Sequence, residues 1–407
     1  MTPRLLFTTL SFAALCSIAL PAHAGEPASP STNAVVGEPD ARILEYMHDA
    51  GIAGVGAAII LDRKVVWTKG YGFADIAHAV PFTPDTVMNI GSISKTVTGV
   101  AMMQTVERGE LSLDADINAY LPFKLVNPHR PDATITLRQL ATHTSGITDR
   151  WSVYAQTYHY DDDAIEPLED FLRSYFVPGG THYSADNFLD AEPGTQQDYS
   201  NIGAALAGYI VERATRQPLN RYTREHVFQP LRMDASGWLL SEIDRSRHAR
   251  LYVAQDGMTI PIAFYEGTTY PDGGVRTSVT DLSKFFIELL EGGEYKGARI
   301  LERRSVDEML RFQFTPSSKP GNIDLAEENA GLFWSTKFNV TRVGHGGSDP
   351  GIKTEMLANL SKDVGVIVFT NTSLAGPEMK SFAGIFLALW KHAEALKSQD
   401  GMAAAAR

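Results

Sequence analysis

The chain has 407 residues, of which 44% are hydrophobic and 21% are charged. This balance excludes disorder of the whole chain and suffices for one large core or two joined ones. The formal net charge of -12, without a run of Lys or Arg, argues against nucleic acid or an anionic membrane surface as the partner.

The first residues have the pattern of a secretory signal peptide. Arg4 gives a positive start, residues 5–20 are largely apolar, and Ala22-His23-Ala24 has the small-x-small form of a cleavage site. The alternative is a membrane anchor, but a stretch this short, ended by Pro21, would barely cross a bilayer core of ~30 Å. We therefore expect residues 1–24 to be removed and the mature protein to be exported, periplasmic or secreted, without membrane attachment.

The mature chain offers little for cofactor or metal chemistry. Its only cysteine, Cys16, lies inside the predicted signal peptide, so we expect no disulfide, thiol nucleophile or thiolate metal site. The sequence contains no His-x-His, no His-Glu-x-x-His and no glycine-rich nucleotide motif. No metal and no cofactor are predicted, and His143, His159 and His182 are given no role.

Residues 25–37 are rich in Pro, Ser, Ala and Gly and are predicted to form a flexible tail. Apolar positions at helical spacing predict a helix over 41–48, and two β-rich runs, 55–61 and 64–69, predict a hairpin. After Gly91 the apolar positions again recur at helical spacing. Ser92 is therefore expected at or next to the start of a helix.

The middle of the chain, up to about residue 271, mixes helical segments such as 202–213 with loops rich in Pro and Gly, as expected of a helical lobe. Its segment 151–188, rich in Tyr and Asp, is expected to shape a pocket, with Asp161-Asp162-Asp163 in a solvated loop. Beyond the lobe the pattern predicts a helix over 281–290, strands over 343–345, 353–360 and 364–370, and a closing helix over 377–396.

Strands are therefore predicted at both ends of the chain. A single sheet built from both ends, with the helical lobe inserted between them, explains this order more simply than two consecutive domains. The predicted unit spans 38–397, followed by a flexible tail over 398–407. Its sheet lobe covers about 38–90 and 272–397, and its helical lobe covers about 91–271.

A possible nucleophile lies at the start of the predicted helix. A serine hydroxyl reacts poorly until a base removes its proton. In Gly91-Ser92-Ile93-Ser94-Lys95 a three-residue step puts Lys95 one turn from Ser92 and on the same face. Burial would lower the pKa of this lysine, and the helix N-terminus would favour the negative charge that develops during attack. The alternative is a capping serine followed by a surface lysine.

Two further clusters follow along the chain. Tyr199-Ser200-Asn201 lies on a turn before an apolar helix, where a core tyrosine and a helix cap are the alternative reading. Gly344-His345-Gly346-Gly347-Ser348 lies at a predicted strand edge, where small residues let a substrate backbone approach and leave amide groups free to donate. Its alternative is a glycine-rich bend. Each cluster alone fits a structural role, but three in this order favour a catalytic site.

Together, Ser92-x-x-Lys95, Tyr199-x-Asn201 and His345-Gly346-Gly347 resemble the three signature elements of the superfamily of serine β-lactamases, penicillin-binding DD-peptidases and related esterases. The stretches 136–146, 229–233 and 272–277 resemble segments of its class C and DD-peptidase-like branch. The resemblance implies an α+β fold, in which an antiparallel sheet flanked by terminal helices lies beside an inserted, mainly helical domain. It also places the active site between the two.

The resemblance implies a role for each of these residues. Ser92 would attack a carbonyl group, Lys95 and Tyr199 would share proton transfer, and Asn201 would help to hold the substrate. The backbone N–H groups of Ser92 and Ser348 would form an oxyanion hole, a device in which each donor contributes roughly 2.7 to 4 kcal/mol.

The third element also bears on the substrate, which His345, Gly346, Gly347 and Ser348 are expected to bind. Lactamases of this superfamily commonly carry Lys-Thr-Gly there, whereas His345 is only partly charged near neutral pH and Gly346 has no side-chain donor. We expect acyl transfer through a covalent ester on Ser92, with an ester, a D-amino-acid amide or a peptide, such as a cell-wall peptide, as substrate. Alternatives are a β-lactamase proper and a slow-acylating or non-catalytic penicillin-binding or sensor protein.

Overall fold

A computed structural model describes residues 39–160, 166–255 and 258–405. The predicted signal peptide, the tail over 25–37 and the Asp161-Asp162-Asp163 run lie outside the described residues.

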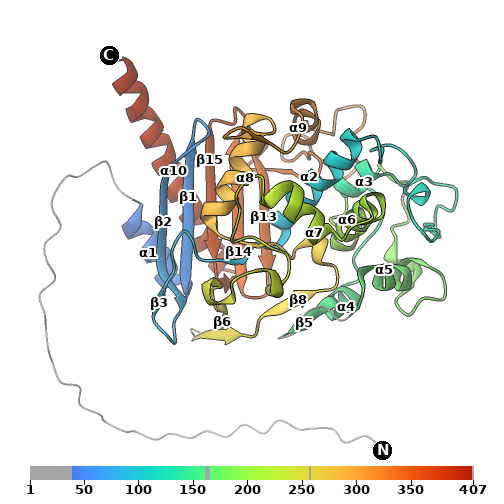
Figure 1. Cartoon of the computed structure of the whole chain (residues 1–407), viewed down its shortest axis with the longest axis horizontal. Coiled ribbons are helices and arrows are strands. Elements are labelled where there is room, and N and C mark those ends of the chain that lie inside the picture. Colours follow the sequence, from blue (N-terminus) through green and yellow to red (C-terminus); the bar gives the residue numbers. More distant parts are fainter. Residues whose placement is uncertain (1–38, 161–165, 256–257, 406–407) are drawn as a thin grey trace, which may run out of the picture. The chain divides into compact units, whose positions relative to one another are not determined.

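The central element is a seven-stranded antiparallel sheet with the strand order β12-β13-β14-β15-β1-β2-β3 (Figure 1). β1 pairs with β15, so that Val55 lies opposite Thr370 and Leu61 lies opposite Val364. Strands from both ends of the chain share one sheet, and the predicted α+β fold is confirmed. The strands are β1 (Gly54–Leu61), β2 (Lys64–Asp75), β3 (Val80–Pro81), β12 (Ser335–Lys337), β13 (Arg342–Asp349), β14 (Ile352–Asn359) and β15 (Val364–Thr370).

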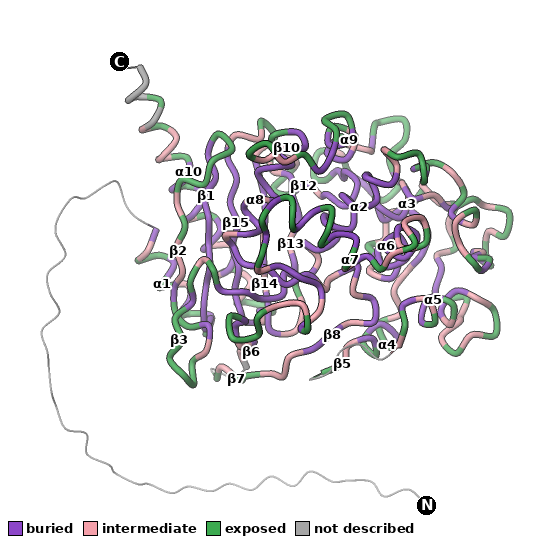
Figure 2. Tube along the Cα trace, viewed as in Figure 1, coloured by how far each residue is buried: buried purple, intermediate pink, exposed green. Residues whose placement is uncertain are grey.

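β1 is buried along its whole length and contributes to two cores (Figure 2). Val55 and Ile59 belong to the core that contains the terminal helices α1 (Asp40–Asp49) and α10 (Glu378–Ala405). Ala58 and Ile60 belong to the larger core on the other face. Because successive side chains of a strand point to opposite faces, this strand reads as one continuous apolar run.

The second face of the sheet is covered by α8, and most other helices belong to the inserted segment. Within this segment α2 packs on α6. The helices are α2 (Ser94–Glu107), α3 (Leu137–Ala141), α4 (Trp151–Tyr154), α5 (Leu168–Phe176), α6 (Asn201–Thr215), α7 (Leu219–Thr223), α8 (Val279–Glu291) and α9 (Arg303–Leu310). None of the helices in the described part of the chain is both long and apolar enough to cross a bilayer.

Short strands also occur in and around the segment that is predicted to be helical. Runs of two to five residues are too short to show a period in the sequence, so pattern analysis misses them. They form the pairs β4 (Met88–Asn89) with β9 (Arg276–Thr277), β5 (Tyr158–Tyr160) with β8 (Tyr265–Gly267), β6 (Leu251–Gln255) with β7 (Met258–Ile262) and β16 (Thr372–Ser373), and β10 (Glu294–Tyr295) with β11 (Ala298–Arg299).

The closing helix is longer than the sequence predicts. A flexible tail is expected from residue 398, but α10 continues to Ala405. Alanine has the highest intrinsic helix propensity, so the alanine-rich end prolongs the helix.

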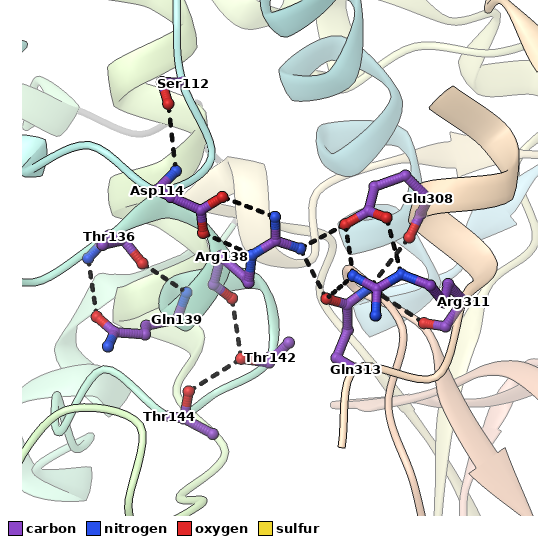
Figure 3. Close-up of polar contacts among 10 residues, drawn as sticks. All are labelled: Ser112, Asp114, Thr136, Arg138, Gln139, Thr142, Thr144, Glu308, Arg311 and Gln313. Atoms are coloured by element: carbon purple, nitrogen blue, oxygen red, sulfur yellow. Dashed lines mark hydrogen bonds and ion pairs between the residues drawn. The ribbon is translucent and has the colours of Figure 1, made fainter. Parts of the chain in front are cut away.

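A polar network centred on Arg138 joins α3 to α9 (Figure 3). The Arg138 guanidinium donates two hydrogen bonds to Asp114, at 2.6 and 2.8 Å, and one each to Glu308 and Gln313, at 2.5 and 2.7 Å. Glu308 also accepts two hydrogen bonds from Arg311. The network therefore connects segments that are about 170 residues apart in sequence.

Candidate active site

Ser92 lies in the 3-10 turn η1 (Gly91–Ile93), which leads directly into α2. Gly91 has a φ of +53°, a conformation that favours glycine. A Cβ atom at Gly91 would lie 3.2 Å from the backbone nitrogen of Ser348 on β13. The turn that carries the predicted nucleophile is therefore held against the strand that carries the third motif.

Gly347 permits this close approach of β13 to the turn. A Cβ atom at Gly347 would lie 2.1 Å from the carbonyl oxygen of Ile90, a separation that no side chain can tolerate. The hydroxyl of Thr354 donates to the same carbonyl at 2.9 Å and fixes its position. The approach brings the backbone nitrogen of Ser348, the predicted second oxyanion donor, against the turn that carries Ser92.

Lys95 is completely buried, and its ammonium group makes three hydrogen bonds. The Nζ atom donates to Ser92 Oγ at 3.0 Å, to Asn201 Oδ1 at 2.7 Å and to the carbonyl oxygen of Asp272 at 2.8 Å. An ammonium group has three hydrogens, so its capacity is fully used. The surface lysine of the alternative reading is excluded.

The pKa of Lys95 corrects the sequence-based expectation. Burial opposes the ammonium charge, but attraction from Tyr199, Asp272 and Asp349 outweighs burial and raises the pKa above that of a free lysine. The nearest carboxylate oxygen, Asp272 Oδ1, lies 4.0 Å from Nζ. Burial acts in the expected direction, but the prediction of a lowered pKa is wrong, because the fold also brings Tyr199 and two carboxylates to the lysine. Lys95 is therefore a cation at neutral pH.

Tyr199 stands over the Lys95 ammonium, whose Nζ lies 5.0 Å from the centre of its ring. The ring centre lies 4.3 Å from that of His143 and 6.3 Å from that of His345. Tyr199 is 45% exposed and lines a cavity, which excludes the alternative of a core tyrosine.

His143, to which the sequence analysis gives no role, is buried against Tyr199. Its Nδ1 atom accepts a hydrogen bond from the backbone N–H of Ser200 at 3.2 Å, so the proton of the neutral ring is on Nε2. Burial lowers the pKa of His143 well below its ordinary value. It is a neutral positioning residue for the turn that carries Tyr199, and its only sequence signal is its place in the 136–146 stretch.

The N-terminus of α6 is fixed by Asp149, a residue that no sequence pattern singles out. The Asp149 carboxylate accepts hydrogen bonds from the backbone N–H groups of Asn201 and Ile202, at 2.7 and 3.1 Å, and from the Ser200 hydroxyl at 2.8 Å. A carboxylate also complements the positive end of a helix dipole. Asp149 therefore holds Asn201 where its side chain accepts from Lys95.

His345 lies on β13 and is buried. Its Nδ1 atom donates to the carbonyl oxygen of Gly346 at 2.7 Å, since a carbonyl only accepts, and the Nε2 atom is thus an acceptor. Burial, reinforced by the charge of Lys95, lowers the pKa of His345 to about 3. The expectation of a partly charged histidine is wrong, because this ring is neutral throughout the physiological pH range.

A cavity of about 740 Å³ lies above these residues. The segment that the sequence predicts to shape the pocket contributes Trp151, Tyr154 and Tyr158 to its wall. The structure brings all eight predicted site residues together: Lys95 lies beneath Ser92, and the wall includes Ser92, Tyr199, Asn201, His345, Gly346, Gly347 and Ser348. Within the described ranges no group of His, Cys, Asp or Glu has an arrangement that could hold a metal ion.

Two carboxylates that the sequence analysis does not single out lie beside this cluster. Asp272 is 3% exposed and accepts from the Tyr154 hydroxyl at 3.0 Å, and burial raises its pKa to about 7. Asp349 accepts from the Tyr158 hydroxyl at 2.7 Å, and burial raises its pKa to about 6. Strand alternation could have found Asp349, because it shares a face of β13 with His345.

Comparison with known proteins agrees with this arrangement. The family model described as Beta-lactamase matches residues 39–386. The chain is 25% identical over 337 residues to Protein flp of Staphylococcus aureus (strain N315), which is 81% of this chain and 62% of that protein. The chain thus spans less than two thirds of the length of this relative.

Solved structures show the same likeness. A structure of the octameric penicillin-binding protein homologue from Pyrococcus abyssi is 27% identical, with a TM-score of 0.69 over 87% of this chain and 77% of that one. A β-lactamase/D-alanine carboxypeptidase from Pseudomonas syringae is 20% identical, with a TM-score of 0.66 over 86% of this chain and 98% of that one. The second likeness is one of fold alone.

Proposed function

The chain belongs to the beta-lactamase family, and from this premise we propose that it is an exported serine hydrolase that forms a covalent acyl-enzyme on Ser92. The observation that carries the proposal is the hydrogen bond of 3.0 Å between a fully buried lysine, Lys95, and the Ser92 hydroxyl. A capping serine would not need a buried cation at its oxygen, since burying an ammonium group is costly without a function or a partner.

In the proposed reaction Ser92 Oγ forms a bond to the carbonyl carbon of the substrate. Tyr199 receives the Oγ proton as it gives its own proton to the leaving atom, so that the bond from carbon to the leaving group breaks without a free ion. Water then attacks the ester by the reverse relay and regenerates Ser92. The raised pKa of Lys95 supports this division of labour, because a lysine that stays protonated acts as a fixed cation rather than as the base.

The carbonyl oxygen of the substrate becomes negatively charged during attack. The backbone N–H groups of Ser92 and Ser348 are the proposed donors, supported by the contact of the Gly91 position with the Ser348 nitrogen. The Lys95 cation lies within hydrogen-bond distance of the attacking oxygen and favours the same charge.

We propose an ester, a D-amino-acid amide or a peptide, a cell-wall peptide included, as the substrate in preference to a β-lactam. His345 is neutral and its Nε2 atom is an acceptor, so this position on β13 offers no cation to a lactam carboxylate. Two lysines also line the cavity, but Lys337 lies on β12 and Lys353 on β14, so neither occupies this position on β13.

Intact-protein mass after incubation with aryl esters, D-amino-acid amides, D-Ala-D-Ala peptides and penicillins tests this proposal. We expect a Ser92-dependent adduct and turnover of an ester or amide, both lost in Ser92→Ala. Turnover confined to penicillins would instead identify a β-lactamase. A stable penicillin adduct without turnover of any substrate would identify a penicillin-binding or sensor protein. Absence of both an adduct and a Ser92-dependent product with every compound would refute the acyl-enzyme.

We also propose export with cleavage after Ala24, supported by the composition of residues 1–24. N-terminal sequencing of the protein recovered outside the cytoplasm is expected to begin at Gly25. Recovery of the uncleaved chain in the membrane fraction would contradict cleavage.

A further inference from the structure

The cavity has two chemically different ends along β13. Residues two apart on a strand share a face, so His345 and Asp349 both face the helical lobe, about 13 Å apart at the rise of a strand. Tyr199 lies at the end of the cavity that contains His345. Tyr158 lies at the end that contains Asp349. In the proposed reaction Tyr199 protonates the leaving group. The leaving group therefore departs toward His345, and the acyl group extends toward Asp349.

Asp349 lies close to the reacting centre. It follows Ser348, whose backbone nitrogen is a proposed oxyanion donor, and a Cβ atom at Gly91 would lie 3.2 Å from its Oδ2 atom. Its Oδ1 atom accepts from Tyr158, but neither a hydrogen bond of Oδ2 nor an ion pair of Asp349 occurs within residues 39–160, 166–255 and 258–405. One carboxylate oxygen is thus available at the acyl end of a cavity that this side chain lines.

The cations beneath the cavity form their close ion pairs with other carboxylates and compensate Asp349 only in part. Lys95 faces Asp272 at 4.0 Å, and Arg276 forms an ion pair with Glu266 at 3.3 Å. The two histidines at the site are neutral. The second carboxylate, Asp349, is half-buried and attracts Lys95 and Arg276, but it forms no ion pair within the described ranges.

A second observation also points to a ligand. Asp272 is only 3% exposed, and its Oδ2 atom has no hydrogen-bond partner among the described residues. Asp272 and Asp349 both line a small cavity of about 20 Å³. This volume holds roughly one water molecule, so a small polar group fits in the cavity that both residues line.

The wall at this end is aromatic. The ring centres of Trp151 and Tyr154 are 5.8 Å apart, and those of Tyr154 and Tyr158 are 5.7 Å apart with the rings nearly perpendicular. Trp151 is 69% exposed although it lines the cavity. Tryptophan and tyrosine faces attract cations, so an aromatic wall in the same cavity as a carboxylate suits an ammonium group.

We propose that the acyl group of the substrate carries a protonated amine, which binds the Asp349 carboxylate beside the Trp151 and Tyr158 rings. The substrates are then aminoacyl esters or amides with a free amino group, and Asp349 determines this specificity. The inference rests on the proposed function, because it assumes that Ser92 is acylated. It goes beyond that function by naming the charge on the acyl side.

The test compares pairs of aryl esters that differ only in the amine, such as alanyl against propionyl and β-alanyl against butyryl, at pH 7.5. The measured quantity is the ratio of kcat/KM for the amine to that for its neutral partner, because a variant that only disturbs the fold lowers both rates together. We expect a ratio of at least about tenfold in the wild type, equivalent to about 1.4 kcal/mol. Asp349→Asn is expected to reduce this ratio to about one.

Two further variants serve as controls. Asp349→Glu keeps the charge and is expected to retain part of the preference. Tyr158→Phe removes the hydrogen bond to Oδ1 but leaves the carboxylate, so the amine should remain preferred. These variants keep the test valid if Asp349→Asn does not fold, since the ratio in the wild type alone decides whether an amine is preferred.

Each outcome bears on the proposal differently. A wild-type ratio near or below one, with Ser92-dependent turnover of the neutral esters, overturns the amine site and leaves the serine hydrolase standing. A preference that survives in Asp349→Asn overturns the assignment to Asp349. If no ester gives a Ser92-dependent adduct or Ser92-dependent turnover, the proposed function is overturned and this inference with it.

Discussion

Two polar networks of this protein are each centred on one basic side chain, and they differ in how their charges are compensated. Arg138 is partly exposed, at 26% of its side chain. Its hydrogen bonds lower the pKa of Asp114, and hydrogen bonds from Arg311 and Arg138 lower the pKa of Glu308 (Figure 3). Lys95 has no exposed side-chain surface, and the carboxylates near it, Asp272 and Asp349, have raised pKa values. A lowered carboxylate pKa stabilises the fold at neutral pH, and a raised one destabilises it.

The difference follows from burial. Water and several donors solvate the carboxylates around Arg138, whereas those near Lys95 are removed from water with fewer donors. We conclude that the Arg138 network stabilises the fold, whereas the carboxylates of the Lys95 network destabilise it where the site is formed. Such a loss of stability is common at functional sites.

The largest expected effect comes from removing the central cation of each network. Lys95→Met should lower kcat/KM for any ester that the wild type turns over by about a thousandfold or more, because the oxygen of Ser92 loses its buried cation. Arg138→Met should change kcat/KM by less than about threefold, since Arg138 does not line the cavity. Steady-state kinetics of the two variants measure this contrast. Equal losses would show that the networks do not differ in function.

For the stability of the fold we expect the opposite order, in which the Arg138 network matters more than the Lys95 network. Arg138→Met should lower the free energy of unfolding by about 2 kcal/mol, because it removes two hydrogen bonds to Asp114 and one to Glu308. Urea unfolding at pH 7 measures the change, and Arg311→Met, which removes a more exposed partner of Glu308, is the matched control with a smaller loss. If Arg138→Met left the free energy of unfolding unchanged, the network would make no contribution to stability.

Asp349→Asn tests the destabilising carboxylate. The folded-state pKa of Asp349 is about 6, against an ordinary pKa of 3.8, so the folded wild type binds a proton more tightly and loses stability as pH rises from about 4 to 6. The variant should therefore be more stable than the wild type at pH 8, by about 1 to 3 kcal/mol, and equally stable below about pH 4. Urea unfolding at both pH values measures this. A variant less stable than the wild type at pH 8 would contradict the assignment.

Glu308→Gln should show a smaller effect with the opposite sign. The pKa of Glu308 is lowered to about 2 from its ordinary value of 4.5, so its stabilising contribution is present above about pH 4.5 and is lost as pH falls to about 2. Because Glu308 and its two arginine partners are partly exposed to water, the variant should be about 1 kcal/mol less stable at pH 7. The difference should vanish near pH 2 in the same unfolding measurement. A difference that persists there would mean that packing rather than charge is responsible.

Much of the site was accessible from local sequence. The spacing of Ser92 and Lys95 predicted their contact, because a helix brings residues three apart onto one face wherever it forms. The order of the strands predicted one sheet made from both ends of the chain. The charge states were not accessible: Lys95 and His345 both differ from expectation, since a pKa depends on neighbours that arrive from distant segments.

The sequence by itself thus determined the class of the fold, the nucleophile pair and the three motifs, because helix spacing, strand alternation and turn residues are properties of short segments. Only the tertiary structure decided the supporting parts. Asp149 caps α6 from 52 residues away, and the Asp272 carbonyl reaches Lys95 across 177 residues. His143 and Asp349 acquire their partners in the same way. Such contacts arise when the sheet and the inserted lobe pack together, and no local pattern encodes them.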